Sequence, residues 1–271
     1  MVVGYRRWRT EHIEALHAAS EVIATANGPV EVSRRGEGPP VLMIHGTPGG
    51  HDQGFFAEFL VSAGFSIIAP SRPGYLRTPL ATGSSWSGQA DAVASLLDAL
   101  EIDRAPVYGA SGGGPTMIHL AARHPDRVQA LMLECAISGP LSVDVPAFVL
   151  RLLTSTLAVW FQLHLFRRFP TTVLRGLLSQ ESTLSKADRK RLADEIAESQ
   201  TDLDYVRELM LSTTPSDRRR AGLDNDLALF ERADPFPFDG VRCPTLVVHG
   251  TADGDVPFEH AERSQREIAG T

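Results

Sequence analysis

Short apolar runs and helical patterns alternate along the chain between residues 41 and 135. Strands that are buried on both faces of a parallel sheet read as continuous apolar runs of this kind. Repeated strand–helix alternation therefore predicts an α/β fold, with a mostly parallel central sheet flanked by helices. The expected strands are residues 41–44, 66–69, 105–108 and 128–135, and the expected helices are residues 55–63, 86–100 and 115–123.

The alternation stops at Ser138-Gly139-Pro140 and resumes with a strand at residues 244–248. The intervening residues, 141–233, show helical patterns without a clear strand. We therefore expect residues 1–140 and 234–271 to form the α/β core, with 141–233 as a helical cap, or lid, over the carboxyl edge of the sheet.

At the amino end, residues 8–25 predict an amphipathic helix. Asn27-Gly28-Pro29 would end this helix, because glycine and proline in this position stop helices. A first strand is expected at residues 30–34.

The segment Gly109-Ala110-Ser111-Gly112-Gly113 lies directly between an expected strand and an expected helix. The pattern G-x-S-x-G in this setting is typical of a nucleophile elbow, a sharp turn that exposes the serine Oγ at the carboxyl edge of the sheet. Such a turn strains the backbone, and small neighbours relieve the crowding. Ser111 is therefore the candidate nucleophile. The alternative is a glycine-rich turn whose serine only caps the following helix.

A second glycine-rich segment, His45-Gly46-Thr47-Pro48-Gly49-Gly50, follows the strand at 41–44. A nucleophilic serine needs N–H donors that face the oxyanion formed on its substrate. Pro48 has no N–H, so Thr47 is the candidate donor, with the N–H of Gly112 as its partner. Alone, the segment could be an ordinary loop. The elbow downstream favours the interpretation as an oxyanion hole.

Three motifs together resemble the α/β-hydrolase superfamily, most closely its esterase and proline-iminopeptidase-like branches. They are HGTPGG at 45–50, SRPGY at 71–75 and GASGGG at 109–114. The likeness runs from residue 30 over nearly the whole chain, with the insertion where that family carries its cap. It implies a serine nucleophile, a histidine base and an aspartate that orients the imidazole. Serine at the elbow argues against dehalogenase or epoxide-hydrolase chemistry, in which a carboxylate attacks.

The resemblance also places the acid of the triad. HGTADGDVP at 249–257 matches the segment that follows the penultimate core strand in this family, with Asp253 at the position of the triad acid. Asp255 is the competing acid, expected to face solvent or to brace the turn before Pro257. Glu134, on the strand after the elbow, is a third candidate with an expected structural role.

The matching histidine base is missing from the expected place. The family carries it after one more helix and one more strand, whereas only 18 residues follow Asp253. A helix of about 11 residues, a strand of about 5 and their connections need more. The resemblance therefore predicts either a C-terminally truncated enzyme, which we favour, or a hydrolase-fold protein that has lost its base.

The remaining histidines are weak substitutes for this base. His260 is expected on the last helix, pointing away from the elbow, and His164 lies in the lid, where it could approach the pocket. His45 is expected to brace its own loop by hydrogen bonding, and His249 is expected to end a core strand. His119 and His124 are expected on or after the elbow helix, against neighbouring structure or solvent. No set of histidines and cysteines has the spacing of a metal site, and we expect no metal or organic cofactor.

Composition limits the class of partner. The formal net charge is −7, with 26 Lys and Arg against 33 Asp and Glu, which argues against a nucleic-acid binder because phosphate contact needs a basic surface. Cys135 and Cys243 are expected as free thiols beside strands. The start of the chain lacks a signal-peptide pattern, and the apolar stretch 152–166 is shorter than the roughly 20 residues of a membrane span. A cytoplasmic protein without stable membrane insertion is expected.

The sequence thus predicts a serine hydrolase that cleaves an ester or related acyl bond through an acyl-enzyme on Ser111. The substrate is expected to be a small molecule with a hydrophobic group. This expectation rests on lid residues that would line an apolar pocket, although the same residues could simply pack the lid on the core: Phe148, Leu152, Trp160 and Phe161. The alternative is a catalytically impaired protein that uses a capped pocket to bind a ligand.

Overall fold

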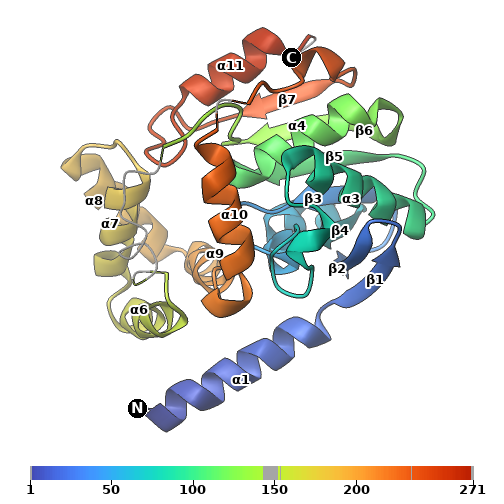
Figure 1. Ribbon diagram of the computed structural model, residues 1–271. Coiled ribbons are helices and arrows are strands. Elements are labelled where there is room, and N and C mark those ends of the chain that lie inside the picture. Colours follow the sequence, from blue (N-terminus) through green and yellow to red (C-terminus); the bar gives the residue numbers. More distant parts are fainter. Residues whose placement is uncertain (1, 143–151, 153, 233, 270–271) are drawn as a thin grey trace.

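The computed structural model describes residues 2–142, 152, 154–232 and 234–269. Its centre is a seven-stranded sheet with the strand order β1-β2-β4-β3-β5-β6-β7 (Figure 1). Strands β4, β3, β5, β6 and β7 are parallel, and only β1 and β2 run antiparallel to their neighbours. This arrangement confirms the predicted mostly parallel α/β fold. The strands are β1 (Glu21–Thr25), β2 (Gly28–Arg35), β3 (Pro40–Ile44), β4 (Ser66–Pro70), β5 (Ala105–Ala110), β6 (Val128–Glu134) and β7 (Thr245–Val248).

The central strand β3 explains why the apolar runs are continuous. Leu42 and Ile44 are fully buried on one face, in a cluster that includes side chains of α3 (Trp86–Ala99) and α4 (Gly114–Arg123). Val41 and Met43 are buried on the opposite face, against η1 (His51–Ala57) and α2 (Glu58–Ser62). Because both faces are covered, every position of the strand must be apolar. The last helix, α11 (Glu259–Glu267), packs beside β7.

The amino end differs from the prediction of one long helix over residues 8–25. Helix α1 spans Val2–Ala18, and residues 21–25 form β1, which pairs with β2 as a hairpin. Gly28 has φ +121° at the turn, a conformation that favours glycine. The asparagine–glycine pair is thus a hairpin turn and not a helix stop. The helical periodicity concealed the strand because Val22, Ile23 and Thr25 satisfy both patterns.

Among the described residues between β6 and β7, five helices are present. Helices α6 to α9 pack around a shared apolar cluster that includes Val159, Leu174 and Met210. Ser155, Ser185 and Ser199 cap three of these helices, each accepting a hydrogen bond from the N–H three residues later. Helix α10 lies between this cluster and the sheet (Figure 1). The helices are α6 (Thr156–Arg168), α7 (Pro170–Glu181), α8 (Lys186–Glu198), α9 (Gln200–Leu211) and α10 (Arg220–Phe230).

Two further features concern the surface. Across the residues that the structure describes, no helix is long and apolar enough to cross a membrane. Strand β7 forms one edge of the sheet, and its side chains Leu246 and Val248 are 55% and 42% exposed.

Short 3-10 turns connect the main elements: η2 (Leu80–Thr82), η3 (Ser111–Gly113), η4 (Pro125–Arg127), η5 (Ser216–Arg218) and η6 (Phe238–Gly240).

Candidate active site

Ser111 stands at the turn between β5 and α4 with a strained backbone. Its φ is +50°, in the left-handed region that side-chain-bearing residues rarely adopt. Two glycines make this turn possible by allowing close approach to β3. A Cβ on Gly109 would lie 2.3 Å from the carbonyl oxygen of Ile44, and one on Gly113 would lie 2.8 Å from that of His45. The serine is therefore held in the geometry of a nucleophile elbow.

The two predicted oxyanion donors lie side by side next to this serine. A Cβ on Gly46 would be 3.4 Å from the Cβ of Ser111. A Cβ on Gly112 would lie only 2.1 Å from Thr47 Oγ1. The structure thus brings Ser111, Thr47 and Gly112 together from two loops at the carboxyl edge of the sheet.

Buried side chains hold the loop that carries Thr47. His45 Nδ1 donates to the carbonyl of Gly46 at 2.7 Å, and its Nε2 accepts from the N–H of Arg72 at 2.8 Å. Burial, followed by the nearby Arg72 charge, holds the pKa of His45 well below its usual value, so the ring is neutral. Gln53 accepts from the N–H of Gly46 at 2.9 Å and donates to the carbonyl of Pro48 at 3.0 Å. His45 therefore braces its loop, as the sequence predicted.

Ser111 and Asp253 line one pocket of about 350 Å³. Cys135 lies at its wall, and the rest comes from the loop after β7 and from α7, α8 and their connection. The predicted lid residues Leu152, Trp160 and Phe161 do not line it, while Phe148 lies outside the described residues. Apolar lining comes instead from side chains that the sequence did not single out: Leu178, Leu184, Leu192 and Val256.

Asp253 is fixed by its own loop. Its Oδ1 accepts the N–H groups of Asp255 and Val256, both at 2.9 Å. Its Oδ2 lies 3.5 Å from Nε2 of His249, which also contacts the carbonyl of Val256 at 2.8 Å. One carboxylate oxygen thus fixes the turn, and the other faces a buried imidazole.

Sequence reasoning missed the group formed by Cys135, His249 and Asp253. Ligand-type atoms of these three residues lie within 4.8 Å of one another. Within the described part of the chain they are the one set close enough to hold a metal ion. No short-range spacing could have revealed them, because Cys135 follows β6 and the other two follow β7.

The competing acids have distinct surroundings. Asp255 lines the pocket and also braces the turn through its backbone N–H. Glu134 accepts a hydrogen bond from the hydroxyl of Tyr108, in agreement with a structural role. Glu181, at the end of α7, lines the pocket as well. Although part of its surface is exposed, burial of the rest, followed by the charges of Asp255 and Asp253, raises the pKa of Glu181 to about 7.

Two of the histidines weighed as bases are held by contacts outside the pocket. His260 Nδ1 accepts from the N–H of Ser138 at 3.0 Å, and His164 Nδ1 contacts the carbonyl of Trp160 at 2.8 Å. Among the residues that the structure describes, no histidine lines the pocket of Ser111.

The sequence profile of the alpha/beta hydrolase fold family matches residues 39–270. The chain belongs to this family. An uncharacterized hydrolase of Bacillus subtilis (strain 168), YcgS, is 29% identical over 265 residues, which are 92% of this chain and 87% of the relative. The pimeloyl-[acyl-carrier protein] methyl ester esterase of Aromatoleum aromaticum is 27% identical over 228 residues, 83% of each chain.

A solved structure of an alpha/beta hydrolase fold protein from Nakamurella multipartita superposes with a TM-score of 0.87 at 39% identity. The match covers 93% of this chain and 88% of that one. Because the family and the relatives named here are hydrolases, the chain is a hydrolase enzyme.

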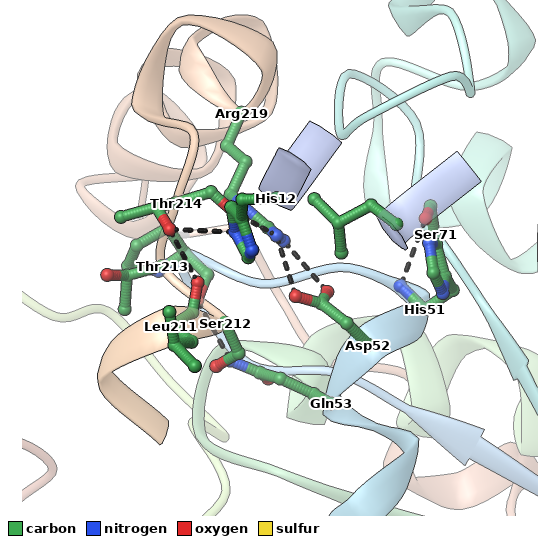
Figure 2. A network of polar contacts seen from close by, with 12 residues as sticks. His12, His51, Asp52, Gln53, Ser71, Leu211, Ser212, Thr213, Thr214 and Arg219 are labelled. Carbon is green, nitrogen blue, oxygen red and sulfur yellow. Dashed lines mark hydrogen bonds and ion pairs between the residues drawn. The ribbon is translucent and has the colours of Figure 1, made fainter. Parts of the chain in front are cut away.

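A second hollow of this hydrolase, about 460 Å³, lies beside α1 and shares no lining residue with the pocket of Ser111. Figure 2 shows the polar network at its wall. Arg219, nearly fully buried, makes two bonds to the carboxylate of Asp52, at 3.0 and 2.7 Å, and donates to the carbonyl of Thr214. His12 of α1 contacts the same carbonyl at 3.2 Å. This network anchors the segment that leads into α10.

Proposed function

We propose that this hydrolase cleaves ester or related acyl bonds through an acyl-enzyme on Ser111. The observation that carries the proposal is the strained Ser111, adjacent to the Thr47 loop and sharing a pocket with Asp253. Serine, and not a carboxylate, at the elbow supports acyl transfer. The relationship to a methyl ester esterase supports an ester as the substrate.

The proposed reaction has two steps. Ser111 Oγ attacks the acyl carbonyl and gives its proton to a base, and the N–H groups of Thr47 and Gly112 donate to the oxyanion. The alcohol leaves with a proton, and water then attacks the acyl-enzyme to release the acid and restore the serine. Asp253 orients the base. No step of the proposal requires a metal or an organic cofactor.

The proposed substrate is a small molecule with a hydrophobic group. Leu178, Leu184 and Leu192 give apolar surface to the pocket that Ser111 lines. These leucines belong to the segment 141–233, which we propose acts as the cap over the α/β core. The net charge of −7 disfavours nucleic acid as a partner, and we propose a cytoplasmic location.

One observation favours a second candidate function. No histidine of the described residues lines the pocket, and a serine without a base retains only the weaker catalysis of the oxyanion hole and of binding. In this alternative, the capped pocket binds an apolar ligand without turnover.

Mass-spectrometric labelling with a fluorophosphonate distinguishes the two candidates. The proposal expects labelling confined to Ser111, turnover of p-nitrophenyl butyrate, and loss of both in Ser111→Ala. Ser182→Ala is the matched control, because Ser182 lines the same pocket, and it should still be labelled at Ser111. Folded chain that binds the ester saturably but is neither labelled nor active would support the ligand-binding candidate instead.

A further inference from the structure

Helix α10 contacts both loops that carry the proposed oxyanion donors. Asp226 and Phe230 are four residues apart and so lie on one face of the helix. Asp226 reaches the side chain of Thr47, and the ring of Phe230 lies 3.1 Å from where a Cβ on Gly112 would stand. One helix face thus touches both donors.

The contact at Asp226 is a fully buried charge network. Oδ2 of Asp226 accepts from Thr47 Oγ1 at 2.5 Å and from the hydroxyl of Tyr75 at 2.6 Å. Arg72 donates to both carboxylate oxygens, at 3.1 and 2.7 Å. Asp226, Arg72 and Tyr75 are all at most 1% exposed. Charge-assisted bonds between buried groups are strong and fix their partners in place.

Arg72 extends the network along the backbone of the Thr47 loop. Its guanidinium donates to the carbonyls of His45 and Gly46, both at 3.1 Å. It also donates to Thr47 Oγ1 at 2.8 Å. Thr47 Oγ1 therefore accepts from Arg72 and donates to Asp226, which restricts its rotation and the orientation of its peptide group.

The start of α10 is also held by contacts that do not involve the Asp226 carboxylate. Arg219, immediately before the helix, pairs with Asp52, and Gly222 packs its backbone against the ring of Tyr75. The N–H of Gly222 donates to the carbonyl of Gly74 at 2.8 Å. Phe230 at the other end stacks on Trp86 with ring centroids 5.5 Å apart. Both ends of the helix are thus fixed to the core.

We infer that Asp226 is a positioning residue that, together with Arg72, holds the Thr47 N–H in the orientation that stabilises the oxyanion. The inference rests on the proposed acyl transfer at Ser111. Oxyanion donors act because they are preorganised, and loss of one lowers kcat by about 100- to 1000-fold. A donor that is present but loosely held should lose part of this effect, while substrate binding is retained.

Thr47→Val is the decisive variant. It keeps the backbone N–H and the branched shape but removes Oγ1, and the ion pair between Arg72 and Asp226 remains. We expect kcat for p-nitrophenyl butyrate to fall at least about 10-fold with KM within about 2-fold. Thr47→Ser restores the hydroxyl and should regain most of the lost kcat. Asp226→Asn should lower kcat in the same way.

Asp224→Asn is the matched control on α10. Asp224 is partly exposed and faces Arg220 along the helix surface, so this variant should leave kcat, KM and the melting temperature unchanged. Equal kcat in wild type and Thr47→Val would overturn the inference. So would a fall in kcat that follows the melting temperature across the variants and is not regained in Thr47→Ser.

Amide exchange measured by NMR separates this inference from the proposed function. In Thr47→Val, the Gly46 amide should exchange at least about 10-fold faster than in wild type or Thr47→Ser. If wild type neither hydrolyses the ester nor is labelled, the proposed function fails, and the exchange rates alone decide whether Asp226 orders the loop. Unchanged exchange would refute that ordering.

Discussion

Ser111 and Asp253 line one pocket, although the two strands that they follow are separated in the sheet by a third strand. Ser111 comes after β5 and Asp253 after β7, with β6 between them. Because the carboxyl ends of parallel strands meet at one edge of the sheet, residues distant in sequence converge there. Cys135, which follows β6, lines the same pocket.

The first prediction separates the two candidate acids. Asp253→Asn retains an oxygen for the N–H groups of Asp255 and Val256 but loses the charge that would orient a base. We expect kcat for p-nitrophenyl butyrate to fall by about 10⁴-fold with little loss of stability. Asp255→Asn should change kcat by less than about 5-fold. A larger loss in Asp255→Asn than in Asp253→Asn would reverse the assignment.

The second prediction concerns space at the elbow. A side chain at Gly112 would collide with Thr47 Oγ1, which Asp226 and Arg72 hold in place. Gly112→Ala should therefore displace Thr47 and reduce kcat at least about 10-fold. Steady-state kinetics and thermal unfolding of the purified variant provide the measurement.

Gly176→Ala is the matched control for this substitution. Gly176 lies inside α7 with nothing within 4 Å of an added Cβ. The alanine should raise the free energy of unfolding by about 0.5–1 kcal/mol, with kcat unchanged. If Gly112→Ala were as active as Gly176→Ala, the proposed oxyanion geometry would be wrong.

The third prediction concerns the charge of the substrate. The pKa of Glu181 is raised to about 7, so this carboxyl is ionised at pH 8 and mostly protonated at pH 6. At pH 8, Glu181→Gln should raise kcat/KM for a p-nitrophenyl hemisuccinate, an anionic ester, by about 5-fold, as expected for about 1 kcal/mol of repulsion. At pH 6 the gain should disappear. The uncharged butyrate ester should show little change at either pH.

The fourth prediction concerns stability in acid. Burial, followed by the charge of Arg123, lowers the pKa of His119 to about 4, whereas an unfolded histidine titrates near 6.5. Between about pH 6.5 and pH 4, His119 binds a proton in the unfolded chain but not in the folded one. The contribution of the neutral His119 to the free energy of unfolding is therefore fully present above about pH 6.5 and is lost as the pH falls towards 4. Within this range, each such proton lowers the free energy of unfolding by about 1.4 kcal/mol for every pH unit that the pH falls.

Urea unfolding at pH 7.5, 6.0 and 5.0 tests this titration. His119→Gln should lose stability less steeply than wild type across the range. Other buried histidines with lowered pKa, among them His45 and His51, should keep some slope in the variant. Parallel curves for the two proteins would show that His119 does not titrate on unfolding.

Local pattern was sufficient to predict the elements around the site. The apolar runs at 41–44 and 105–108, each followed by a glycine-rich segment, lie in β3 and β5. Their burial on both faces removes the alternation that an exposed strand shows. The turn at Ser111 could be predicted because its strain requires small neighbours, and Gly109 and Gly113 occupy those positions.

Long-range pairing could not be predicted in the same way. Nothing in the local sequence of α10 distinguishes Asp226 from the exposed Asp224, yet Asp226 is fully buried against Arg72. The strand β1 was missed for a related reason, because its pairing with β2 decides between two acceptable local patterns. The expectation of a histidine base stays a prediction, because no histidine among the described residues lines the pocket of Ser111.

The edge strand β7 has a consequence for handling the protein in solution. Its outer side offers backbone N–H and C=O groups without a neighbouring strand among the described residues, and Leu246 and Val248 add exposed apolar surface. An edge with these properties is a template for pairing with another extended chain. Concentrated samples of this 271-residue chain should therefore self-associate through β7, and Leu246→Lys should keep the chains apart.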